Sequence, residues 1–63
     1  MAFEHDGGMV APRSGSSAPT WTNTSGSSKW IQLGDGLKQF ASPDEQVELT
    51  DDIYAEMRAA AGT

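Results

Sequence analysis

The sequence predicts a small α+β protein with a long extended N-terminal arm, a short β-hairpin, an extended piece and one C-terminal helix. Three observations predict this fold class. Residues 14–28 carry no charged side chain, two strand-like runs flank Gly34-Asp35-Gly36, and a capped apolar stripe follows Thr50. At 63 residues the chain is one small domain at most.

Residues 1–28 are expected to form the extended arm. Large side chains near its start are separated by glycine and proline and follow no period of 2 or 3.6 residues, so they define no face. Further on, Trp21 is the only large apolar residue between residues 14 and 28. Because ordering a backbone costs about 1 to 2 kcal/mol per residue, we expect a neighbouring molecule to order this run.

A β-hairpin is expected from about Lys29 to Ala41. The runs KWIQL and LKQFA flank Gly34-Asp35-Gly36, where either glycine can adopt a positive φ angle at low cost. Trp30 and Ile31 are adjacent, so one face of a strand cannot hold both. Each face of the hairpin therefore has an apolar side chain to cover, and an isolated hairpin is only marginally stable in water.

An extended piece from Gln46 to Leu49 and a helix from about Asp51 to Ala61 are expected to complete the chain. Thr50 can cap the helix, and two aspartates in the first turn suit the positive end of the helix dipole. Ile53 and Met57 begin an apolar stripe at helical spacing. The helix has about three turns and would not persist alone.

The chain offers little independent core. It has no cysteine and a single histidine, which excludes a disulfide framework and leaves a structural zinc site too few ligands. We therefore expect two parts: an arm over residues 1–28 and a hairpin-plus-helix docking module over residues 29–63. The free chain is expected to give poorly dispersed amide signals and no cooperative melting transition.

The net charge of −5 is concentrated near the C-terminus. Six acids lie within thirteen residues: Asp44, Glu45, Glu48, Asp51, Asp52 and Glu56. Nucleic acid is not an expected partner, because its binding requires clustered lysine and arginine. The same cluster motivates an alternative function, a small acidic inhibitor that mimics nucleic acid.

No catalytic, cofactor or metal site is expected, and the chain is not predicted to be an enzyme. Glu4, His5 and Asp6 are possible ligands, but adjacent residues of an extended segment point in alternate directions. A membrane partner is also not expected, because no apolar run approaches the length of about 20 residues that spans a bilayer. The N-terminal segment carries acids where a signal peptide has bases, so export by that route is not expected.

Partner binding is expected to depend on large apolar side chains. Trp21 is isolated in polar sequence, which favours a role as an anchor in a partner's pocket. The full set of predicted partner-binding residues is Phe3, Val10, Trp21, Trp30, Ile31 and Phe40.

The C-terminal segment carries Val47, Leu49, Thr50 and Asp51 in a V-x-L-T-D pattern before an acidic-capped, alanine-rich helix. In this respect it resembles short virion proteins of tailed bacteriophages. The resemblance implies a non-enzymatic capsid decoration, cement or minor capsid protein, present in many copies on a symmetric particle and bound to larger subunits such as the major capsid protein. Its expected location is the virion. An adaptor subunit of a cellular complex, located in the cytoplasm, is the other alternative.

Overall fold

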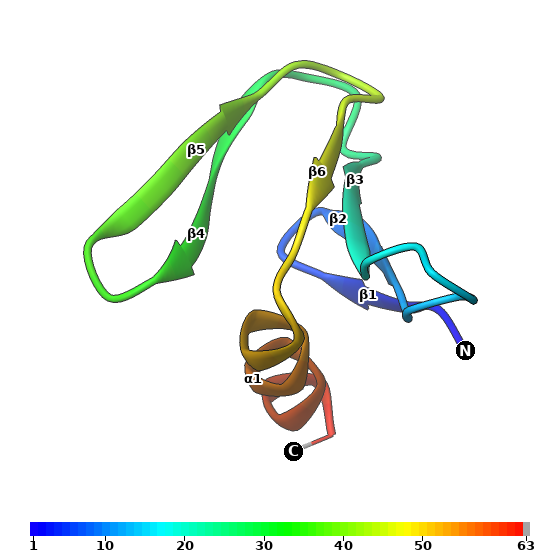
Figure 1. The fold of residues 1–63 in the computed structure, drawn as a ribbon. Helices are drawn as coiled ribbons and strands as arrows, with labels where there is room; N and C mark the ends of the chain where they lie inside the picture. The colour runs from blue at the N-terminus through cyan, green and yellow to red at the C-terminus, as the bar shows by residue number, and fades with distance from the viewer. Residues whose placement is uncertain (63) are drawn as a thin grey trace.

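Two antiparallel sheets and one helix make up the computed structural model, which describes residues 1–62. Figure 1 shows the hairpin of the second sheet on one side, the first sheet on the other and the helix below them. The elements are β1 (Phe3–His5), β2 (Gly8–Ala11), β3 (Thr20–Asn23), β4 (Lys29–Gly34), β5 (Leu37–Ala41), β6 (Gln46–Glu48) and α1 (Asp51–Ala61).

The first sheet begins with a tight hairpin between β1 and β2. His5 pairs with Gly8, so only Asp6 and Gly7 form the turn, and their φ angles are 49° and 79°. Two consecutive positive φ angles match the right-handed twist of the flanking strands, and Asp-Gly is a favoured sequence for such a turn. This local geometry directs β2 back along β1.

Four strands in the order β1-β2-β3-β6 complete this sheet. Phe3 lies opposite Val10, Val10 opposite Trp21, and Trp21 opposite Val47. Directly opposed residues of antiparallel strands share one face, so these four side chains form a continuous apolar row across the sheet. Trp21 is therefore packed between neighbours that lie far from it in the sequence.

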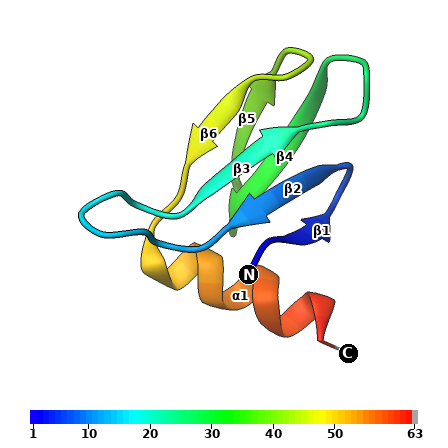
Figure 2. The same ribbon diagram turned by 90° about the vertical axis from the view of Figure 1, so that its right-hand side faces the viewer.

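The second sheet is the hairpin of β4 and β5, as the sequence predicts. Figure 2 shows it behind the first sheet, with α1 along the lower end of both. Ile31 and Leu33 are buried, and the core also contains Met57 from α1 and Leu49 from the segment before it. Both sheets and the helix thus contribute to one core.

The C-terminal helix spans the range expected from its cap and apolar stripe. The Thr50 hydroxyl accepts a hydrogen bond from the Ile53 backbone N–H at 3.1 Å. Met57 is its buried residue, and the Tyr54 ring lies 5.8 Å from the Phe3 ring, centroid to centroid. The helix is therefore held against β1 as well as against the core.

The expectation of a long extended N-terminal arm is wrong. Strand β1 already starts at Phe3, and the first 28 residues contribute three strands to the first sheet. Their backbone also bonds to later parts of the chain: Leu49 N–H donates to the Pro19 carbonyl and Asn23 N–H to the Glu45 carbonyl. The protein is therefore mostly β, with two antiparallel sheets and one C-terminal helix, so the expected α+β class is also wrong. The core is larger than expected, because Val10 and Trp21 from the first 28 residues belong to it.

Candidate functional site

The exposed side of the β4–β5 hairpin carries the largest apolar side chains that the core leaves uncovered. In β4, Ile31 and Leu33 are buried while Trp30 and Gln32 are exposed. Trp30 pairs with Phe40, and Gln32 pairs with Lys38, so all four lie on the side facing away from the core. We refer to these four residues as the hairpin outer face.

Trp30 and Phe40 form a cross-strand aromatic pair on this face. Their ring centroids are 5.3 Å apart, with the planes at 63° to each other, which is a favourable edge-on arrangement. Trp30 is nevertheless 60% exposed and Phe40 50% exposed. Fully burying an exposed side chain of this kind contributes about 1.5 to 3 kcal/mol, so covering the exposed half of each ring leaves roughly half of that available to a partner.

Lys38 gives the hairpin outer face a positive charge in a molecule whose net charge is −5. Two other bases are occupied, because Arg13 pairs with Asp51 and Lys29 pairs with Asp6. Within residues 1–62, Lys38 has no such ion pair. The face therefore combines two aromatic rings, an amide and an unpaired ammonium group.

The predicted partner-binding residues fall into two groups. Val10, Trp21 and Ile31 are completely buried in the core of the chain itself. Phe3 is half-buried against Tyr54. Trp30 and Phe40 are the two members of the predicted set that the structure places on an exposed face.

Trp21 is held inside the chain by a polar contact as well as by packing. Its indole Nε1–H donates a 2.9 Å hydrogen bond to the His5 carbonyl. Gly8 lies directly against the ring, and a Cβ atom at this position would overlap both the indole and the Thr22 carbonyl. The residue expected to fill a partner's pocket instead fills a pocket of its own chain.

Two members of the acidic cluster have structural roles. Asp51 receives three hydrogen bonds of 3.0 to 3.2 Å from the Arg13 guanidinium, a contact between residues 38 positions apart. Glu45 accepts a 2.8 Å hydrogen bond from the Ser42 backbone N–H. The fold thus brings a base to an acidic stretch, residues 44–56, that contains no lysine or arginine of its own.

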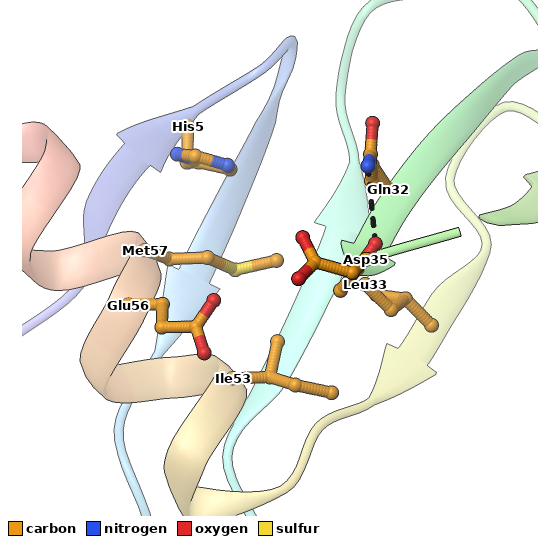
Figure 3. Close-up of a pocket in the computed structure, with 8 residues that line it drawn as sticks. His5, Gln32, Leu33, Asp35, Ile53, Glu56 and Met57 are labelled. Carbon is orange, nitrogen blue, oxygen red and sulfur yellow. Dashed lines mark hydrogen bonds between the residues drawn. The ribbon is translucent and has the colours of Figure 1, made fainter. Parts of the chain in front are cut away.

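An open groove of about 200 Å³ lies between α1, β1 and the turn of the β4–β5 hairpin. Figure 3 shows His5, Glu56 and Asp35 around it, together with apolar Ile53, Leu33 and Met57. In the described residues, neither carboxylate forms a hydrogen bond or ion pair with the His5 ring. The groove therefore lacks the fixed contacts that position an acid–base pair.

Residues 1–62 contain no group of three or more His, Asp or Glu side chains placed to hold a metal ion. Asp6 forms its contacts with Lys29 instead, through both its carboxylate and its backbone carbonyl. None of the helical segments described is long and apolar enough to cross a membrane.

Sequence reasoning missed two features of this surface. Leu37 is 55% exposed at the turn end of β5, and its position directly after Gly36 was a signal for an exposed hairpin tip. Lys38 was also missed, although its spacing from Phe40 places both on one face of a strand.

No protein-family model, curated protein or solved structure matches this chain. The expected relation to phage virion proteins therefore stays a prediction.

Proposed function

We propose that this chain is a non-enzymatic structural protein that docks on a larger protein assembly through the hairpin outer face. The observation that carries the proposal is the exposed Trp30–Phe40 pair on a hairpin whose opposite face contributes Ile31 and Leu33 to the core. Tryptophan is enriched among the residues that carry most of the energy of a protein interface. Lys38 adds a charge that favours an acidic or carbonyl-rich edge on the partner.

The assembly we propose is the virion of a tailed bacteriophage, with the chain as a decoration, cement or minor capsid protein on the major capsid protein. Support comes from the C-terminal pattern of the sequence, in which Val47 and Leu49 precede the Thr50 cap of an acidic-capped helix. Many copies would then be present, one on each equivalent site of a symmetric shell.

The proposal is tested by sedimentation of particles made in the presence of the chain. Wild-type chain is expected in the fraction of DNA-filled particles, and the double variant Trp30→Ser/Phe40→Ser is expected to remain at the top of the gradient. Met9→Ser is the matched control, because Met9 is an exposed apolar residue on the other sheet, and it should sediment like the wild type.

Each alternative outcome rejects a defined part of the proposal. If all three proteins sediment with the particles, the docking face is wrong. If the wild-type chain sediments with a complex that contains no capsid protein, docking stands and the virion location is wrong. If the chain is found only as a free small protein, the proposed function is wrong.

A further inference from the structure

Strand β5 presents an unprotected edge. It pairs with β4 only, and its residues 37–40 are all exposed. Figure 1 shows β5 on the outer side of the hairpin, with β4 closer to the rest of the molecule. Proteins usually protect such an edge with proline, several charges or a covering segment, whereas β5 has no proline and one lysine.

The sequence of β5 is complementary to itself in antiparallel pairing. In a sheet that continues across two copies, the core-facing side of both copies must lie on the same side, which requires a two-fold axis normal to the sheet. With this symmetry, one residue of β5 lies directly opposite the same residue of the second copy, and we call that residue the centre of the pairing. A centre at Gln39 aligns the exposed residues Lys38, Gln39 and Phe40 with the copy, whereas Ala41 at the end of the strand is buried in its own chain. In that register Lys38 lies opposite Phe40.

The charges in this register are compatible. Lys38 of each copy faces the Phe40 ring of the other, which allows an attractive contact between a cation and an aromatic ring. A centre at Lys38 would instead place two ammonium groups directly opposite each other. None of the nine acidic residues lies in β5, so the pairing itself brings no carboxylates together.

We propose that two copies of this chain pair antiparallel along β5, centred on Gln39, to form a continuous four-stranded sheet in the order β4-β5-β5-β4. The two hairpin outer faces then lie side by side, and the aromatic surface becomes twice as wide. This dimer goes beyond the proposed docking function, because it depends on the strand edge rather than on the outer face. Net repulsion between two copies of charge −5 weakens it at low salt.

The first test measures the mass of the full chain in solution by sedimentation equilibrium, and the wild type is expected to be a dimer that strengthens with added salt. Phe40→Lys should weaken the dimer at least tenfold, because the introduced ammonium group would face Lys38 of the second copy. Lys38→Glu/Phe40→Lys should restore it, because each introduced lysine then faces an introduced glutamate. Trp30→Lys is the control, since it adds the same charge on β4, away from the edge.

A cross-linking test determines the register even if the charge variants fold poorly. The chain has no cysteine, so single-cysteine variants are unambiguous. Residues directly opposed across antiparallel strands have Cα atoms about 4.5 to 5.5 Å apart, which suits a disulfide. Gln39→Cys should therefore form a disulfide dimer on mild oxidation at least ten times faster than Leu37→Cys.

Three results would overturn the dimer. The first is a wild-type chain that remains monomeric at millimolar concentration and high salt. The second is equal weakening by Phe40→Lys and Trp30→Lys, which would mean that copies associate through the outer face. The third is equally fast cross-linking at positions 37 and 39. None of these three results decides whether the chain sediments with particles. The dimer and the proposed function can therefore fail separately.

Discussion

At the scale of single residues, Asn23 is the polar side chain that connects the first sheet to the second through hydrogen bonds. It is completely buried, and its Nδ2 group donates to the carbonyls of Ser27, Ala41 and Ser42 at 2.9 to 3.1 Å. Its Oδ1 atom accepts from the backbone and hydroxyl groups of Ser25. A buried side-chain amide satisfied in this way fixes the end of β3 relative to the end of β5.

We expect Asn23→Asp to lower the free energy of unfolding by about 3 kcal/mol or more. The carboxylate keeps the shape of the amide but has no N–H to donate, so three buried carbonyls face a negative charge. Chemical denaturation measures the effect. Gln46→Glu is the matched control, because it makes the same change at an exposed position of β6 and should alter stability by about 0.5 kcal/mol or less. Equal effects of the two substitutions would show that Asn23 has no special role.

Trp21 was predicted to enter a partner's pocket, but it is buried in its own chain. Its neighbours in sequence are polar, so no local signal indicates what it packs against. Val10 and Val47, which flank it in the sheet, are 11 and 26 positions away. A single tryptophan in a polar run is therefore equally compatible with a partner's pocket and with a pocket built from distant strands of its own chain.

At the scale of elements, the helix is the part of the fold whose ends depend on the most local interactions. Thr50 accepts the hydrogen bond of the Ile53 N–H, and Asp51 and Asp52 occupy the first turn. All three features are properties of consecutive residues, so a sequence pattern can identify them.

Thr50→Ala is expected to reduce the free energy of unfolding by about 1 kcal/mol, because the Ile53 N–H loses its acceptor. Thr50→Ser retains the hydroxyl and should restore most of that stability. Thermal or chemical unfolding of the two variants provides the comparison. A Thr50→Ser variant as unstable as Thr50→Ala would contradict the capping role.

The elements predicted from the sequence are those with local signals. The β4–β5 hairpin and the helix were predicted at their observed positions, and Gln46–Glu48 forms a strand within the expected extended piece. The first three strands were missed because each has only three or four residues and few apolar side chains. Asp6-Gly7 was nevertheless a usable signal, since this dipeptide favours a two-residue hairpin turn.

At the scale of the whole molecule, residues 1–28 are part of the fold rather than an arm. Residues 1–28 contribute Val10 and Trp21 to the core, which residues 29–63 alone would lack. Their strands also form backbone pairings with each other and with β6. The isolated chain is therefore expected to unfold cooperatively, contrary to the expectation from sequence alone.

The two tryptophans distinguish a folded N-terminal segment from an arm, because the structure gives them opposite environments. Trp21 is buried with its Nε1–H bonded to the His5 carbonyl, while Trp30 is 60% exposed. The measurement is hydrogen exchange of the two indole N–H groups in the isolated chain, followed by NMR. For a small core worth about 3 to 5 kcal/mol, the Trp21 proton should exchange about 100 to 10,000 times more slowly than the Trp30 proton. Equal exchange rates would contradict a folded N-terminal segment over residues 1–28 and favour an arm that only a partner orders.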